Sequence, residues 1–392
     1  MTNEKRKMIN AQSPKVAIVH DWLYGGGAER VVHALHELYP QAPIYTSYAT
    51  KEWQQKLNNQ VVTGYLNKWP FTKLRKFLPV LRMWWFRSLD LSDYDLIISS
   101  SGNGEAKHIR LNDEKWQMKN GKLNHQVHIC YSHTPVHFYW RNYQQYLDKP
   151  GFGMFDPLAR LGLKLLVKPL RKADYKAAQK VDYFIANSTH IQRDIKKFYG
   201  RESSVVFPPI DTARFLESKN GKRQMKNDKY FVTVSRLVNY KRFDIIVDAC
   251  TKLNLPLTVV GRGPALADLQ KRAGPTISFD TNASDEDVAN YMQSAQAFLF
   301  AAFEDFGVTP VEAMAAGTPV IAYKAGGALD YVIPGKTGEF FAQQTAASLA
   351  NTLQSFNATK YNHDDIKKHA SKFSTKKFQK NIHNVIQNIL SK

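Results

Sequence analysis

Residues 303–322 of the chain read FEDFGVTPVEAMAAGTPVIA. The apolar run over residues 297–302, just before this stretch, is typical of a buried parallel strand. The run ends at two acids and Gly307. Thr309 and Pro310 then predict a helix start, with Thr309 as the N-cap and Pro310 as the first helical residue.

The remainder of the stretch predicts the end of this helix and the start of another strand. Gly317 follows the Ala-rich helix and suits its C-terminal end, and Val320 begins a second apolar run. The whole stretch therefore predicts a strand, a loop, a helix and a strand. Open α/β sheets bind ligands at the carboxyl ends of their strands, where helix N-termini attract phosphate.

Two carboxylates border this loop. Glu304 closes the first strand, and Glu312 lies one to two turns into the helix. Both can face one ligand, and neither residue type is favoured for core packing. The alternative is that the two acids lie on the solvent side of a surface helix.

This stretch resembles the Glu-x7-Glu motif of family 4 of the retaining glycosyltransferases, which have the GT-B fold. Glu304 and Glu312 match its two acids. The resemblance implies that Glu304 holds hydroxyl groups of a donor sugar and that Glu312 holds the ribose of the nucleotide. It also implies that the loop between them binds the donor through Phe306, Gly307, Val308 and Thr309.

A second strand-to-helix junction carries two cations. The apolar run over residues 230–234 leads to Arg236 and Lys241, which could together neutralise a diphosphate. The family uses an Arg-x4-Lys pair with this spacing for that purpose. Gly263 belongs to a further glycine loop that resembles the family's Gly-x-Gly-Pro element. The alternative for the two cations is a solvated helix start.

The N-terminal part of the chain contains a glycine turn and a histidine signature. Gly26 and Gly27 lie between an apolar strand and a helix, an arrangement that binds anions, although a plain tight turn is the alternative. His133 stands just after the strand at residues 127–132, within a stretch that resembles a signature of one branch of family 4. The resemblance implies that Gly26 and Gly27 approach the diphosphate and that His133 contacts the donor sugar near the reacting carbon. His128 lies inside the strand and is expected to be structural.

The chain departs from the family pattern in two places. Asp280, Thr281 and Asn282 stand where the family usually has a glycine, beside the expected base site. Asp330 stands where a glutamate is more usual. The first departure leaves the choice of base open.

The chain has 392 residues and a net charge of +20. Residues 1–205 carry 31 lysines and arginines against 17 aspartates and glutamates, which favours an anionic partner of the first half. The two cysteines, Cys130 and Cys250, lack metal-ligand spacing and suit a reducing compartment. The polar N-terminus and the lack of a long apolar run predict a cytoplasmic protein without a membrane span.

Residues 68–87 read KWPFTKLRKFLPVLRMWWFR, with six basic residues and no acid. Pro79 must divide any helix here. Aromatic and basic residues in this mixture suit a helix in an anionic lipid interface, on the inner face of the plasma membrane. Residues 158–180 repeat the pattern more weakly. For both stretches the alternative is a core helix with a solvated basic face.

The predicted fold is α/β with the GT-B arrangement, in which two Rossmann-like doubly wound domains face a cleft. Residues 1–203 would form the acceptor-binding domain, and residues 204–372 the domain that binds a nucleotide sugar. Residues 373–392 have helical spacing of apolar residues, and the resemblance implies that this last helix crosses back to the first domain.

The implied reaction is a metal-independent transfer of a hexose without any cofactor, with catalytic roles for Glu304, His133, Arg236 and Lys241. The donor is expected to be GDP-mannose, with UDP-glucose or another UDP-sugar as the alternative. The acceptor is expected to be a glycan or a polyprenyl-diphosphate-linked glycan of a bacterial surface polysaccharide. The rival classes are a sugar-nucleotide epimerase of the same fold and a basic nucleic-acid-binding protein, whose stacking motifs we do not find in the sequence.

Overall fold

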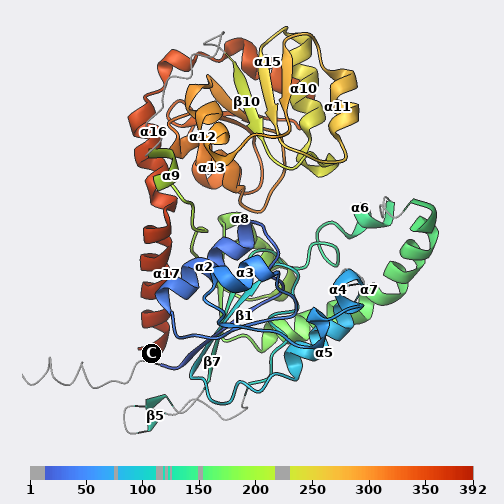
Figure 1. Ribbon diagram of the computed structural model, residues 1–392, viewed down its shortest axis with the longest axis vertical. Helices are drawn as coiled ribbons and strands as arrows, with labels where there is room; N and C mark the ends of the chain where they lie inside the picture. Colours follow the sequence, from blue (N-terminus) through green and yellow to red (C-terminus); the bar gives the residue numbers. More distant parts are fainter. Residues whose placement is uncertain are drawn as a thin grey trace, which may run out of the picture. The chain divides into compact units, whose positions relative to one another are not determined.

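The structure is a computed structural model that describes residues 14–74, 78–111, 118–119, 122–123, 126–148, 153–216 and 230–391. The chain divides into two compact units, Met1–Val206 and Phe207–Lys392. Each unit contains a parallel sheet with helices packed on it (Figure 1).

The first unit is built on a seven-stranded parallel sheet in the order β3-β2-β1-β4-β7-β8-β9. The strands are β1 (Val16–His20), β2 (Ile44–Thr46), β3 (Val61–Val62), β4 (Leu96–Ser101), β7 (Val127–Ser132), β8 (Tyr183–Ala186) and β9 (Ser203–Val205). All five residues of β1 are buried, as expected for an apolar strand covered on both faces. Val205 pairs with Ala186, so β9 completes this first sheet, although the sequence predicted that the second domain begins at residue 204.

The helices of the first unit connect these strands. They are α2 (Gly27–Leu38), α3 (Lys51–Lys56), η1 (Tyr65–Asn67), α4 (Phe71–Leu74), α5 (Pro79–Arg87), α6 (Tyr143–Asp148), η3 (Gly153–Phe155), α7 (Asp156–Gln179) and α8 (Thr189–Tyr199). A two-stranded antiparallel hairpin, β5 (Met118–Lys119) with β6 (Lys122–Leu123), lies apart from the sheet.

The second unit is built on a six-stranded parallel sheet in the order β12-β11-β10-β13-β14-β15. The strands are β10 (Phe231–Val234), β11 (Leu257–Val260), β12 (Ile277–Asp280), β13 (Ala297–Phe300), β14 (Val320–Tyr323) and β15 (Gly338–Phe341). The helices are α9 (Ala213–Leu216), η4 (Asn239–Lys241), α10 (Phe243–Lys252), α11 (Leu266–Arg272), α12 (Asp285–Ser294), α13 (Val308–Ala315), α14 (Ala328–Tyr331), α15 (Ala346–Ser355), η5 (Ala358–Lys360), α16 (His363–Ala370), η6 (Ser371–Phe373) and α17 (Thr375–Leu390).

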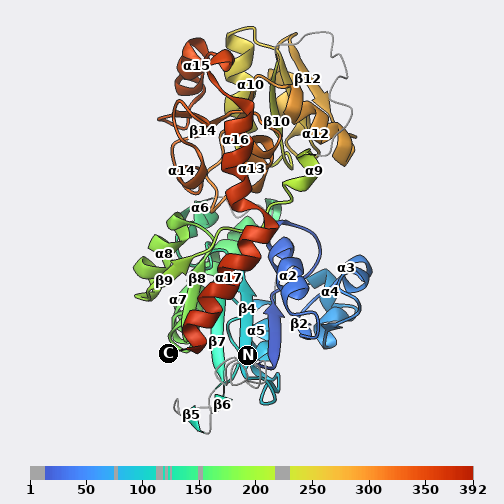
Figure 2. The ribbon, with the colours of Figure 1, turned by 90° about the vertical axis from the view of Figure 1, so that its left-hand side faces the viewer.

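Helices lie on both sides of this sheet (Figure 2). Alternate residues of its central strands belong to two different cores. Phe298 and Phe300 pack with residues of α12, α13 and α16, whereas Ala297 and Leu299 pack with residues of α10, α11 and α15. Both faces of the sheet are therefore covered by helices, which confirms the predicted doubly wound α/β architecture.

The helix of the opening motif begins earlier than its sequence predicted. Gly307 occupies the N-cap position, with φ of 90°, and α13 starts at Val308. The prediction of Thr309 as N-cap was wrong, because Gly307 can take a left-handed turn that places Val308 directly in the helix. The predicted end is confirmed, since Gly317 follows the C-cap residue with φ of 91°.

The last helix, α17, has one buried apolar face. Ser374 caps its N-terminus by accepting a hydrogen bond from the Lys377 amide. The buried residues recur at helical spacing and are Phe378, Ile382, Ile386 and Ile389. The expected return of this helix to the first domain stays a prediction.

The stretch over residues 68–87 is divided at Pro79, as predicted, into α4 and α5. Much of α5, however, belongs to the core of the first unit. Arg82 is 5% exposed and donates from Nη2 to Oε1 of Glu105 over 2.7 Å. Trp85 and Phe86 are buried in a cluster with residues of β1 and β4. The interpretation of Arg82, Trp85 and Phe86 as a lipid-binding surface was therefore wrong.

Only part of that stretch reaches the surface. Trp69 is 77% exposed and Trp84 is 61% exposed. Arg75 and Lys76, which were also assigned to the surface, lie outside the described residues. None of the described helices combines the length and the apolar character needed to cross a bilayer.

Candidate active site

Two strand ends of the second unit bring a cation and a carboxylate together. β10 and β13 are neighbours in the sheet, so the loops after them leave the same edge. Lys241, in the loop after β10, donates from Nζ to Oε1 of Glu304, in the loop after β13. Their side chains are 12% and 19% exposed. Burial, with the charge of Arg236 as a second cause, lowers the pKa of Lys241 to about 8.

Arg236 lies on the same loop as Lys241 and is exposed. Its Nη2 lies 3.5 Å from the hydroxyl of Tyr240. The structure therefore unites Lys241 with Glu304 and keeps Arg236 close enough to influence the Lys241 charge. A diphosphate placed here would receive one guanidinium and one ammonium.

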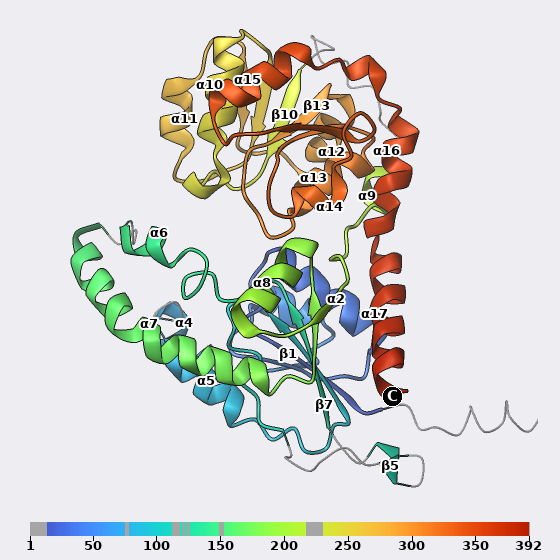
Figure 3. The same cartoon turned by 180° about the vertical axis from the view of Figure 1, so that it is seen from behind.

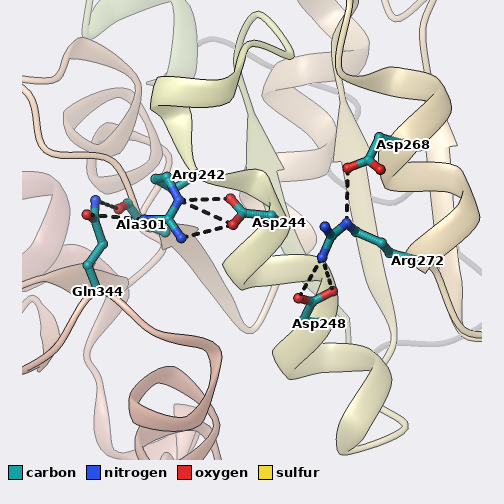
Figure 4. A network of polar contacts seen from close by, with 7 residues as sticks. All are labelled: Arg242, Asp244, Asp248, Asp268, Arg272, Ala301 and Gln344. Atoms are coloured by element: carbon teal, nitrogen blue, oxygen red, sulfur yellow. Dashed lines mark hydrogen bonds and ion pairs between the residues drawn. The ribbon is translucent and has the colours of Figure 1, made fainter. Parts of the chain in front are cut away.

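Arg242 fixes the backbone of this loop (Figure 4). It has a left-handed conformation, with φ of 56°, and its guanidinium binds both carboxylate oxygens of Asp244 at the start of α10. Its Nη1 also reaches Gln344, which donates to the Ala301 carbonyl at the end of β13. Arg242 and Gln344 together thus connect the loops that carry Lys241 and Glu304.

Glycines allow the loops of the site to touch backbone to backbone. A Cβ added to Gly326 would lie 2.3 Å from the carbonyl oxygen of Glu304, and the Gly327 amide donates to that same carbonyl over 2.9 Å. A Cβ on Gly263 would lie 2.2 Å from the Leu237 carbonyl oxygen, beside the Arg236 loop. The sequence of residues 324–327 resembles a glycine-rich loop of the family, but Gly326 and Gly327 were not assigned to the site from it.

The N-terminus of α13 offers backbone donors. The first amides of a helix, here those after Gly307, have no partner within the helix. Glu312 lies in this helix and is 4% exposed. Phe306 is buried and packs against Tyr331. The assignments of Phe306, Gly307, Val308, Thr309 and Glu312 to the donor stay predictions.

The expected base site has its own polar contacts. Arg262 donates to the Thr281 carbonyl and, over 2.7 Å, to Oδ1 of Asn282. Asp280 accepts a hydrogen bond from the Tyr291 hydroxyl over 2.9 Å. Asp280, Thr281 and Asn282, which depart from the family pattern, are thus held in place by neighbours in this structure.

In the first unit, His133 lies at the carboxyl end of the sheet beside a second histidine. Its Nε2 lies 2.8 Å from the hydroxyl oxygen of Ser100, and Nδ1 of His20 lies 2.8 Å from the Ser100 carbonyl. The centres of the two imidazole rings are 6.4 Å apart. Burial, followed by the charge of His20, lowers the pKa of His133 to about 3, so this imidazole is neutral. His128, expected to be structural, is buried and bonded to Ser99.

Asp21 organises the loop beside His133. Its carboxylate accepts hydrogen bonds from the amides of Gly102 and Asn103, both over 2.7 Å, and from that of Ala106 over 2.6 Å. The side chain is buried. We did not single out Asp21 from the sequence, although an acid directly after an apolar strand was a usable signal.

The glycine turn after β1 already binds a carboxylate from its own chain. Gly26 is the N-cap of α2 and Gly27 its first residue. The Gly25 amide donates over 3.1 Å to Oε1 of Glu29, whose side chain is buried. A diphosphate would therefore meet a loop that already holds a carboxylate, and the assignment of Gly26 and Gly27 to the donor stays a prediction. Among the described residues, no cluster of three or more potential metal ligands is found.

Two α/β domains with strand-end sites of this kind define the GT-B class of glycosyltransferase folds. The model "Glycosyltransferase Family 4" matches residues 25–214, and "Glycosyl transferases group 1" matches residues 215–373. Together they account for nearly all of both units. The chain belongs to glycosyltransferase family 4.

Curated relatives match over part of their length. The D-rhamnosyltransferase WbpZ of Pseudomonas aeruginosa is 25% identical over 46% of this chain and 49% of its own length. The GDP-mannose-dependent alpha-(1-6)-phosphatidylinositol monomannoside mannosyltransferase of Mycolicibacterium smegmatis is 30% identical over 33% of this chain and 41% of its own. Each alignment thus spans half of the relative or less.

Solved structures share the fold over most of the chain. The sucrose-phosphate synthase of Thermosynechococcus elongatus superposes with a TM-score of 0.69 and 16% identity, covering 96% of this chain and 99% of that one. This similarity confirms the predicted fold class.

Proposed function

We propose that this protein is a retaining hexosyltransferase that moves a sugar from a nucleoside diphosphate to an acceptor hydroxyl. The observation that carries the proposal is the Lys241–Glu304 ion pair at adjacent strand ends. It places a diphosphate-binding cation beside a carboxylate that can accept hydrogen bonds from sugar hydroxyls. Family membership supports the same reaction class.

The chemistry requires stabilisation of the leaving diphosphate, whose negative charge grows as the glycosidic bond breaks. Arg236, Lys241 and the first amides of α13 would supply that stabilisation. When a donor binds, Lys241 would turn toward the phosphates and Glu304 toward the sugar. These groups supply fixed positive charge without a metal ion, so we propose that the reaction needs neither metal nor cofactor.

The first unit would bind the acceptor. His133, as a neutral imidazole, can exchange a hydrogen bond with a donor-sugar hydroxyl without adding charge near the reacting carbon. Gly26 and Gly27 would approach the diphosphate when the two domains close. Asp21 would act indirectly, because it positions the loop next to His133.

GDP-mannose is the proposed donor, and a UDP-sugar such as UDP-glucose is the second candidate. The name of the mycobacterial relative specifies GDP-mannose and a lipid-borne mannoside acceptor. That name supports a glycan or polyprenyl-diphosphate-linked acceptor in surface polysaccharide synthesis. An acceptor of this kind would place the enzyme in the cytoplasm, at the inner face of the plasma membrane.

A panel of nucleotide sugars tests this proposal. Each donor is scored by thermal shift and by release of nucleoside diphosphate, with Glu304→Gln as the matched variant. We expect GDP-mannose to give the largest shift in the wild type. Incubation with donor alone, followed by sugar analysis, distinguishes a transferase from an epimerase. Epimerised sugar without transfer would refute the proposal.

A further inference from the structure

The longest helix of the first unit, α7, carries apolar residues on two opposite faces. One face packs into the unit through Val167, Leu170 and Ala177, which are buried. The other face begins in η3 and continues along the first half of α7. Its apolar side chains are between 51% and 86% exposed, and they are Met154, Phe155, Leu158, Leu161, Leu165 and Leu166. A helix that only packs onto its own domain needs a single apolar face.

This exposed face lies on a part of α7 that projects from the first unit. The first half of α7 extends away from the sheet, with α6 beside it (Figures 1 and 3). A group of six exposed apolar side chains this close together marks an interaction site on a protein surface. The alternative considered for this stretch, a core helix with a solvated basic face, holds only for its second half.

The exposed leucines continue directly into a row of lysines. Leu158, Leu161 and Leu165 are followed at the same three- and four-residue spacing by three exposed lysines, so the six form a ridge on one side of α7, which continues through the interior Pro169. These lysines are Lys168, Lys172 and Lys176. At 1.5 Å per residue, the apolar and the cationic parts of the ridge are each about 10 Å long.

We propose that this ridge docks the protein on an anionic lipid bilayer, with the leucines below the headgroups and the lysines at the phosphates. Interfacial helices bury their apolar face about 5–10 Å into the bilayer, which is deep enough to cover leucine side chains. The charge of the ridge also suits an anionic bilayer, since the ridge carries three lysines and no acidic residue. Of the two acids on α7, Asp174 is buried in an ion pair with Lys107, and Asp156 lies at the first turn.

Polar contacts join the second half of α7 to the part of the first unit that carries His133. Asp174 also accepts hydrogen bonds from Trp140 Nε1 and from the Tyr199 hydroxyl, over 2.8 and 2.7 Å. Its ion-pair partner Lys107 directly follows Ala106, whose amide Asp21 holds. A docked α7 would thus keep the His133 site close to a lipid-borne acceptor. This last step rests on the proposed function, whereas docking itself does not.

Vesicle flotation tests the docking directly. The full chain is mixed with phosphatidylglycerol-containing vesicles or with pure phosphatidylcholine vesicles, at low and high salt. We expect the wild type to float with anionic vesicles only, and to float less at high salt. Replacement of Leu158, Leu161 and Leu165 by Gln should lower the partition coefficient at least about tenfold, because three apolar side chains no longer leave water.

A lysine variant and a matched control separate the contribution of charge to vesicle binding from that of the leucines. The Lys168, Lys172 and Lys176 to Gln variant should lose most binding at low salt and keep a weak, salt-insensitive remainder. The matched control replaces the exposed Trp69 and Trp84 of the other aromatic stretch by Ser, and it should float as the wild type does. Thermal melts of all variants should coincide, since only exposed side chains change.

A labelled cysteine reports insertion without relying on affinity. Both native cysteines are buried, so an environment-sensitive fluorophore can be attached selectively to Leu161→Cys. Its emission should shift to the blue with anionic vesicles, and the same label on Gln179→Cys should not respond.

Several results would overturn the proposal. They are a wild type that ignores anionic vesicles, a leucine variant that floats unchanged, and loss of flotation in the Trp69/Trp84 variant alone. A wild-type dimer that the leucine variant converts to a monomer, without flotation, would assign the ridge to a second copy of the chain. Nucleotide binding is measured separately on the same samples. Failure of the proposed transferase reaction would therefore not change the conclusion about membrane docking.

Discussion

The Lys241 ammonium donates to Oε1 of Glu304, and this pair joins the ends of two adjacent strands of the second unit. The two residues are 63 positions apart in the chain. Each neutralises the other until a ligand arrives with its own phosphates and hydroxyls. A ligand must therefore compete with this ion pair, so substitution of Glu304 and substitution of Lys241 should have different effects.

Glu304→Gln should abolish sugar transfer and leave the fold intact, because the amide keeps the volume and removes the charge. The freed Lys241 ammonium should bind nucleoside diphosphate at least as tightly as in the wild type. Calorimetry with GDP and UDP, alongside a transfer assay, measures both effects. Near-wild-type turnover in this variant would show that Glu304 is not a catalytic residue.

Arg236→Ala and Lys241→Ala should each weaken binding of the nucleoside diphosphate by about 1.5–3 kcal/mol, as expected for loss of one charge-assisted hydrogen bond. Arg272→Ala is the matched control, since Arg272 joins Asp248 to Asp268 on the surface of α10 and α11 (Figure 4). Unchanged affinity in both site variants would place the phosphate site elsewhere.

Binding of the diphosphate should weaken as pH rises through about 8, because the pKa of Lys241 is lowered to about 8 by burial and by Arg236. Below this pH the ammonium is already charged, and affinity should be flat. Above it, binding must take up a proton, so the dissociation constant should rise by up to about tenfold per pH unit. Calorimetry in buffers of different ionisation enthalpy detects that proton. Lys241→Arg should bind without this pH dependence.

Asp21→Asn should destabilise the first unit by about 1.5–3 kcal/mol, because its carboxylate accepts three backbone hydrogen bonds in a buried position. Transfer should fall as well, since the loop beside His133 loses its anchor. Chemical denaturation measures the stability. The control is Asp90→Asn, whose carboxylate is exposed and bonds only nearby Ser92. Equal stability of the two variants would contradict the positioning role.

Transfer should continue at full rate in EDTA, because fixed cations and helix amides are proposed to neutralise the leaving group. The measurement is a turnover assay after exhaustive chelation, repeated with added magnesium or manganese. Activity that returns only with a divalent ion would refute the metal-independent mechanism.

The sequence of residues 297–322 was sufficient to predict two buried strands and, between them, a loop and a short helix ended by Gly317. Such features depend on contacts within a few residues, which the pattern of apolar residues, glycines and prolines records directly. The order of the motifs likewise identified the two α/β domains and the family. The position of the helix start was less secure, since both Gly307 and Thr309 can occupy an N-cap.

Only the tertiary structure decided which distant residues meet and which helix faces are covered. The pairing of Lys241 with Glu304 depends on the order of strands in the sheet, and the burial of Arg82 depends on Glu105 from another loop. Residues 68–87 and 158–180 have similar compositions, yet in the first Arg82, Met83, Trp85 and Phe86 of α5 are buried in their own domain, whereas the second leaves a row of leucines exposed. Local composition sets what a helix face could bind, whereas packing against the rest of the domain determines which face remains open to bind it.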